Sequence, residues 1–306
     1  MRDDFAVLIL THGRPDNQIT LKTLRRRGYT GKIYIVIDDE DETAEQYREK
    51  YGDMVVQFCK ADAESLFDIG DNFTDRRAVV FARNASFGIA RQLGLRYFLV
   101  LDDDYCKFVY RFNERREYGG WQARNLDAII DVMLQWYIAC PRIATLCMCQ
   151  GGDHLGGPIG RFGKAIVAWR KAMNGFICDT ERPFMFPGRI NEDVNAYTDN
   201  GRRGVLFLSV MQIQLDQMGT QQEAGGLTDI YLNLGTYVKS FYSVMFCPSA
   251  VKVSVLGNVR GGHWKSGGHY RIHHRVSWKN TTPMIIREKH RRVAPKAKRT
   301  AKRGRS

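Results

Sequence analysis

The chain has 306 residues, 44% of them hydrophobic and 26% charged, which is the composition of a soluble globular protein. No apolar run reaches the ~18 residues that a membrane-spanning helix needs, and the N-terminus lacks the regions of a signal peptide, so we expect a cytoplasmic protein that binds no membrane. The seven cysteines include no paired CxxC motif, which favours free thiols over a zinc site or disulfides.

The net charge of +13 is unevenly distributed along the chain. Residues 287–306 contain ten Lys or Arg and a single acid, so they carry +9 and the other 286 residues carry +4. Because this segment has no apolar periodicity, the sequence predicts one folded domain over residues 1–286 followed by a disordered basic tail over 287–306. Such a tail suits a polyanion such as DNA, although a solubilising role fits the same composition.

Strands and helices are predicted to alternate from the N-terminus. Apolar runs predict strands over 5–10, 32–37 and 54–58, and helical periodicity predicts helices over 17–27 and 43–51. This order predicts an α/β fold in which helices flank a mostly parallel sheet. Farther along, the sequence predicts helices over 75–95, 125–139 and 191–200, a helical or mixed segment over 231–242, and strands over 97–101, 142–149, 165–173, 184–187, 205–213 and 251–256.

Polar clusters follow three of the predicted strands. The stretch from Thr11 to Arg14 follows the first strand, Asp38-Asp39 ends the second, and Asp102-Asp103-Asp104 follows the strand over 97–101. If these strands are parallel neighbours, the clusters meet at the carboxyl edge of the sheet, where open α/β sheets bind ligands. No GxGxxG follows the first strand and no GxxxxGK[ST] occurs, which argues against Rossmann dinucleotide binding and P-loop hydrolysis.

The aspartate triplet is the most informative of these clusters. Adjacent carboxylates repel one another, so a cation is expected among them. A divalent metal that carries the phosphates of a substrate meets this need, with Asp102 and Asp104 as its natural ligands. Asp103 is expected to point into the base of the sheet, because alternate residues of a strand face opposite ways. A solvated acidic turn is the alternative interpretation.

These segments, taken in order, resemble the GT-A glycosyltransferases, whose parallel-sheet domain binds a nucleotide-sugar through a DxD strand end and a divalent metal. The matching segments are 8–15, 35–39, 82–90 and 101–104. Two later segments extend the resemblance. Residues 188–194 resemble the element that places an acid against the acceptor hydroxyl, and residues 262–265 resemble the histidine segment that completes the metal shell. Over about residues 5 to 275, the pattern is similar to the TET/JBP-associated glycosyltransferases of phages, which are linked to sugar addition on 5-hydroxymethylcytosine in DNA.

The resemblance implies a role for each candidate residue. Asp193 is expected to be the base that takes the acceptor proton, with Glu192 as the second candidate, although acids also favour a helix N-terminus for purely structural reasons. The metal, Mn²⁺ or Mg²⁺, is expected to be held by Asp102, Asp104 and His263, and His269, His273 and His274 compete for the histidine role. The expected contacts to the nucleotide-sugar, which we expect to be uridine-linked, come from Thr11, Arg14, Asp38, Asp39, Arg83, Asp102, Asp103 and Lys265.

The sequence thus predicts a metal-dependent hexosyltransferase that moves a sugar from a UDP-linked donor onto 5-hydroxymethylcytosine, or another hydroxymethyl-pyrimidine, in DNA. Three alternatives stay open. The acceptor can instead be a protein, lipid or polysaccharide, since all of these share the donor site. A nucleotidyltransferase can use a similar sheet, and a DNA-binding protein can retain this fold without enzymatic activity.

Overall fold

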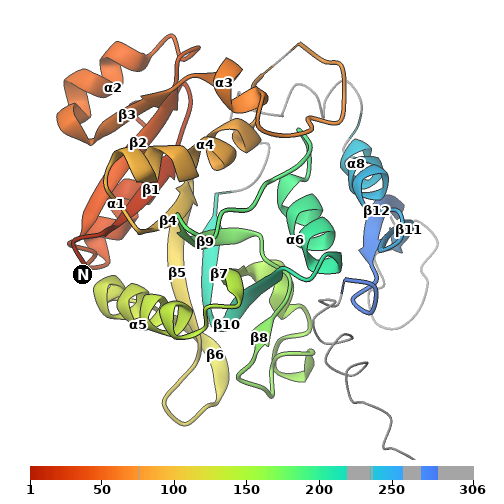
Figure 1. Ribbon diagram of the computed structural model, residues 1–306. Coiled ribbons are helices and arrows are strands. Elements are labelled where there is room, and N and C mark those ends of the chain that lie inside the picture. Colours follow the sequence, from red (N-terminus) through yellow and green to blue (C-terminus); the bar gives the residue numbers. More distant parts are fainter. Residues whose placement is uncertain (75, 219–234, 236, 258–269, 282–306) are drawn as a thin grey trace, which may run out of the picture.

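The computed structural model describes residues 1–74, 76–218, 235, 237–257 and 270–281 (Figure 1). Two of the predicted site residues, His263 and Lys265, lie outside the described residues, as does the predicted basic tail over 287–306. The proposed boundary between domain and tail therefore stays a prediction.

One large sheet organises the described chain, with a two-stranded hairpin beside it. The strands are β1 (Phe5–Leu10), β2 (Lys32–Asp38), β3 (Val55–Phe58), β4 (Tyr97–Asp102), β5 (Tyr105–Phe112), β6 (Tyr118–Gln122), β7 (Ile143–Gln150), β8 (Ala168–Trp169), β9 (Asn174–Asp179), β10 (Leu206–Gln217), β11 (Val251–Gly257) and β12 (Tyr270–Val276). The helices are α1 (Ile19–Arg26), α2 (Ala44–Tyr51), α3 (Lys60–Glu64), α4 (Val79–Gln92), α5 (Leu126–Ala139), α6 (Glu192–Arg202) and α8 (Val238–Phe246).

The strand order confirms the predicted α/β class. Neighbouring strands run in the order β3-β2-β1-β4-β9-β7-β10-β5-β6, and β8 pairs with β10. The first four strands of this order are parallel, as are β7 and β10. Strands β9, β5, β6 and β8 pair with their neighbours in the antiparallel sense, so the parallel sheet predicted from the N-terminal strands continues into a mixed one.

Both faces of the sheet are covered, which explains why β1 is apolar along its whole length. Its odd-numbered residues, Phe5, Val7 and Ile9, join the core beneath α1 and α5. Its even-numbered residues join the core beneath α4 and α6. Figure 1 shows α6 between the main sheet and the unit formed by α8 and the β11–β12 hairpin. Among the described helices, none combines the length and apolar character that crossing a bilayer requires.

Several predicted elements need correction. The strand predicted over 184–187 is irregular chain, because the side chain of Asn84 bonds both the N–H and the carbonyl of Phe186 and so replaces a strand ladder. The strand predicted over 165–173 is reduced to β8. Strands β5, β6 and β9 were not predicted. The segment predicted over 231–242 lies partly outside the described residues, and its described part begins helix α8 at Val238.

Candidate functional site

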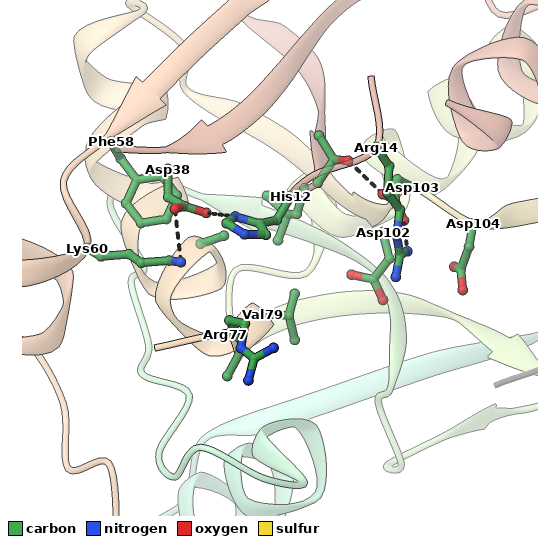
Figure 2. A pocket seen from close by; sticks show the side chains of 14 residues that line it. His12, Arg14, Asp38, Phe58, Lys60, Arg77, Val79, Asp102, Asp103 and Asp104 are labelled. Carbon is green, nitrogen blue, oxygen red and sulfur yellow. Dashed lines mark hydrogen bonds and ion pairs between the residues drawn. The ribbon is translucent and has the colours of Figure 1, made fainter. Parts of the chain in front are cut away.

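The carboxyl ends of β1, β2 and β4 meet at one edge of the sheet. Leu10, the last residue of β1, is in register with Val36 of β2 and with Asp102 of β4. The polar residues that follow these strands therefore converge, as the sequence predicted. They line a cavity of about 210 Å³ together with the residues that precede and begin α4 (Figure 2).

The three aspartates of the triplet have three different environments. Asp102, at the end of β4, is bonded by Arg83 at 3.1 Å. Asp103 is buried and accepts hydrogen bonds from the Thr11 hydroxyl at 2.6 Å and from the Arg14 guanidinium at 3.2 Å. Asp103 also lines the cavity, so its predicted contact with the nucleotide-sugar stays a prediction. Its contacts fix the loop after β1 to the turn after β4.

Asp104 differs from its two neighbours. Its Oδ1 atom is buried, and within the described chain it has no hydrogen-bond partner. Burial, followed by the charges of Asp102 and Asp103, raises the pKa of Asp104 to about 7. A buried carboxylate oxygen without a donor costs free energy unless a proton or a cation is supplied. Figure 2 shows the carboxylates of Asp102 and Asp104 on the same side of the cavity.

A second charged cluster lies at the other end of the cavity. Asp38 accepts from His12 Nδ1 at 2.7 Å and pairs with the Lys60 ammonium at 2.9 Å (Figure 2). Burial works to raise the pKa of Asp38, but the bonds from His12 and Lys60 outweigh it and lower that pKa. In return, the bond to Asp38 raises the pKa of His12. The cluster thus presents a fixed, polar wall to a ligand, with the His12 ring partly exposed.

Arg83, from α4, joins the triplet to the predicted acceptor acids. Its buried guanidinium bonds Asp102 and, at 2.6 Å, the Glu192 carboxylate at the start of α6. The guanidinium also lies over the rings of Phe176 and Phe186, at 5.2 and 5.7 Å. Arg83 therefore fixes the spatial relation between β4 and α6.

Of the two acids that begin α6, Glu192 is buried and Asp193 is partly exposed. Burial raises the pKa of Glu192 to about 7, and the Arg83 charge only partly offsets it. Burial also raises the pKa of Asp193, while Arg83 and Lys171 act in the opposite direction. Asp193 accepts a bond from the N–H of Val194, in the first turn of the helix. Neither acid is among the residues that line the cavity described above. Perturbed carboxyl pKa values are typical of acid–base sites, although buried ion pairs produce them too.

The structure brings most of the predicted donor residues together and separates two of them. The cavity lining includes Thr11, Arg14, Asp38, Asp102, Asp103 and Asp104. Asp39 lies outside this lining and accepts a bond from the N–H of Lys60, and Arg83 lies behind Asp102. Of the competing histidines, the structure describes His273 and His274. His274 accepts a bond from Asn191, and the ring of His273 packs against it at 4.3 Å.

Sequence reasoning missed two cations of the cavity, Lys60 and Arg77, and it gave no role to His12 within the polar stretch after the first strand. All three residues line the cavity. Lys60 directly follows β3, whose neighbour β2 ends at Asp38, so the rule that strand ends share an edge could have identified it. Arg77 precedes α4, and no sequence motif marks it.

The donor set fits a divalent cation in one respect and is incomplete in another. The orphaned oxygen of Asp104 beside Asp102 gives two carboxylates, and Mg²⁺ commonly takes one or two carboxylates and completes its shell with phosphate and water oxygens. Within the described residues, however, no group of three His, Cys, Asp or Glu side chains is arranged to hold a metal. The third predicted ligand, His263, is outside that part of the chain.

Comparisons with known proteins identify a family. Residues 5–226 match the model of a family described as TET-associated glycosyltransferase. No curated protein matches. Among solved structures, glucosyl-3-phosphoglycerate synthase from Mycobacterium tuberculosis, in complex with Mg²⁺ and UDP, is 9% identical with a TM-score of 0.42, over 92% of this chain and 91% of that one. TarS from S. aureus is 13% identical with a TM-score of 0.40, over 78% of this chain and 39% of that one. Similarities this distant carry no argument about ligands.

Proposed function

Since the chain belongs to the TET-associated glycosyltransferase family and is therefore a glycosyltransferase, we propose that it transfers a hexose from a UDP-linked donor to the hydroxymethyl group of 5-hydroxymethylcytosine in DNA. The observation that carries the donor half of this proposal is the carboxyl edge of the sheet. There Asp104 offers a buried oxygen beside Asp102 that has no hydrogen-bond partner among the described residues. A diphosphate bound through a divalent cation would satisfy that oxygen.

In this proposal, Asp102 and Asp104 hold Mn²⁺ or Mg²⁺, and His263 supplies a further ligand. The bound cation supplies Lewis-acid stabilisation to the diphosphate as it departs. Asp103, held by Thr11 and Arg14, fixes the turn that carries the two ligands. The wall formed by His12, Asp38 and Lys60 faces the nucleoside, with donors and acceptors set for ribose and base.

The acceptor half depends on the acids of α6. Asp193, or Glu192 beside it, takes the proton of the attacking hydroxyl if the reaction inverts the anomeric centre. A carboxyl group whose pKa is raised towards neutrality is a better base than an ordinary carboxylate, and burial raises both pKa values here. Arg83 keeps these acids at a fixed distance from the metal ligand Asp102.

DNA as the acceptor is supported by the charge of the chain. Residues 287–306 carry +9, which suits a polyanion. A cytoplasmic location, where such DNA and nucleotide-sugars meet, is part of the same proposal.

The direct test is mass spectrometry of hydroxymethylcytosine-containing DNA after incubation with the full chain, Mn²⁺ and a panel of nucleotide-sugars. The proposal predicts a hexose mass added only to hydroxymethylated DNA, with nucleoside diphosphate released. Release of pyrophosphate would contradict it and identify a nucleotidyltransferase. Turnover that occurs only with a protein, lipid or polysaccharide in place of DNA would contradict the DNA acceptor and leave the donor site intact.

A further inference from the structure

A ridge of stacked aromatic and cationic side chains lies beside the acceptor end of the site. We define the ridge as Arg161, Phe162, Trp169, Arg170 and Trp278. Arg161 lies over the rings of Phe162 and Trp169, 5.2 Å from each. Trp169 packs against Phe162 at 4.8 Å and against Trp278 at 5.3 Å, and Arg170 lies over Trp278 at 5.8 Å. Two segments close in sequence, residues 161–162 and 169–170, thus form one continuous stack with the distant Trp278.

The ridge is joined to the predicted catalytic acids by two routes. Tyr197 stacks on Trp278 with an angle of 16° between their planes, and it lies one helical turn after Asp193 on α6. Lys171 lies over Trp169, and its charge lowers the pKa of Asp193. A strand bound along the ridge would therefore end at the acids that activate the acceptor.

The charge of Arg161 is accessible at the surface of the ridge. Arg161 is exposed, and among the described residues no carboxylate pairs with it. Arg170 donates to two backbone carbonyls, those of Trp278 and Thr281. Burial, followed by the charge of Arg161, lowers the pKa of Arg170, which indicates that the two guanidinium groups repel each other. An anion between them would relieve this repulsion.

The stacking also prepares Arg161 to bind phosphate. A guanidinium whose flat face lies on aromatic rings keeps its N–H edge available, and it loses less conformational freedom on binding than a free side chain. Phosphate oxygens are bound bidentately by such an edge. Lys164, three residues on, is exposed and adds a further positive charge.

The end of the described chain lies at the ridge. Arg170 bonds the carbonyl of Thr281, the last described residue, at 3.5 Å. The sequence that follows contains the ten Lys or Arg of residues 287–306.

We propose that this ridge, with Lys164, binds the phosphodiester backbone of the DNA strand that carries the acceptor base and leads that strand to Asp193. The inference rests on the proposed function, because it takes DNA as the acceptor. It adds the path by which the strand reaches the site.

The test compares two double variants of the full chain that lose the same charge. Arg161→Gln/Lys164→Gln removes two cations beside the ridge. Lys22→Gln/Arg26→Gln removes two exposed cations from α1, which Figure 1 places on the opposite side of the view from β8. Binding to a fluorescent hydroxymethylcytosine oligonucleotide is measured by anisotropy over a range of salt concentrations, and the KM for the nucleotide-sugar is measured in parallel.

The ridge variant should bind DNA about five- to tenfold more weakly, with the slope of log K against log salt reduced by about 1 to 2. The α1 variant should bind within about twofold of the unchanged chain, and neither should alter the KM for the donor. The single variant Arg161→Lys keeps the positive charge. It should therefore retain most of the slope of log K against log salt that the unchanged chain shows.

Equal weakening by both double variants, or no weakening by the ridge variant, would overturn the proposal. The binding measurement needs no sugar transfer, so it separates the two ideas. If DNA is glycosylated but the ridge variant binds normally, the ridge proposal fails and the proposed function stands. If the ridge variant alone loses DNA binding while no DNA product forms, the acceptor chemistry fails and the ridge stands as a DNA-binding surface.

Discussion

Asp102, Asp103 and Asp104 are chemically identical side chains that the fold uses in three ways. Asp102 pairs with Arg83, Asp103 fixes the β1 loop, and Asp104 keeps an unpartnered oxygen within the described chain. Alternation along a strand does not fix the direction of Asp103, because β4 ends at Asp102 and the next two aspartates form a turn. The sequence could not predict the partner of Asp102, since Arg83 reaches it from a helix earlier in the chain.

His274 illustrates a titration that the fold imposes on one residue. Its Nδ1 accepts a bond from Asn191 at 3.2 Å, which requires the ring to be neutral at that atom. Burial lowers the pKa of His274 to about 4, helped by His273, Lys239 and Lys171. The folded pKa therefore lies below the value near 6.5 of an unfolded histidine, so the unfolded chain binds more protons at mildly acidic pH.

We expect the free energy of unfolding to decrease as the pH falls from about 6.5 towards 4, with His274 contributing about 2 kcal/mol of that loss by pH 5. His274→Asn keeps an acceptor for Asn191 and removes the titration. Denaturant unfolding at pH 7 and pH 5 should show a smaller loss in this variant than in the unchanged chain. Equal losses would show that His274 is not buried as described.

At the scale of elements, one side chain decides the path of a segment. Asn84, in the middle of α4, is buried and bonds the N–H and the carbonyl of Phe186 at 2.9 Å each. Phe184 and Phe186 still enter the core, which is why their alternation favoured a strand. The prediction failed because a side chain, not a neighbouring strand, pairs the backbone here.

Replacing Asn84 with Ala should leave two buried backbone groups of Phe186 unpaired and cost about 2–4 kcal/mol of stability. Asn200→Ala is a matched control, because the Asn200 amide bonds the carbonyl of Met185 in the same segment but at an exposed position. That control should cost less than about 1 kcal/mol. Chemical denaturation of the two variants measures the difference, and similar costs would disprove the role given to Asn84.

The missed strands share a physical cause. In β9, the six residues are all buried, and the strand lies antiparallel between β4 and β7. Its short sequence, which includes Asn174 and Gly175, has no periodicity that separates it from a loop. In β5, charged Lys107 and Arg111 interrupt the apolar pattern. Pairing with strands distant in sequence stabilises both, and such pairing is not visible in a local window.

At the scale of the whole molecule, the sequence predicted the α/β class and the shared edge of the first strands, and the roles of the site residues stay predictions. Apolar runs that end in acids are local signals, and parallel topology alone brings Thr11, Asp38 and Asp102 to one edge. Residues that reach this edge from elsewhere carried no such signal, as Arg77 shows. The same holds for the ridge, where Trp278 meets the earlier segments only in the fold.

The central claim of the account is that Asp102 and Asp104 hold a divalent cation that carries the donor diphosphate. Calorimetric titration of UDP into the full chain, with Mn²⁺ or with a chelator, tests it directly. We predict that UDP binding requires Mn²⁺ and that the Asp104→Asn substitution weakens UDP binding by at least about tenfold. The control substitution Asp53→Asn, at an exposed aspartate away from the cavity, should leave UDP binding unchanged. UDP binding of equal strength in the chelator, or in Asp104→Asn, would contradict the account.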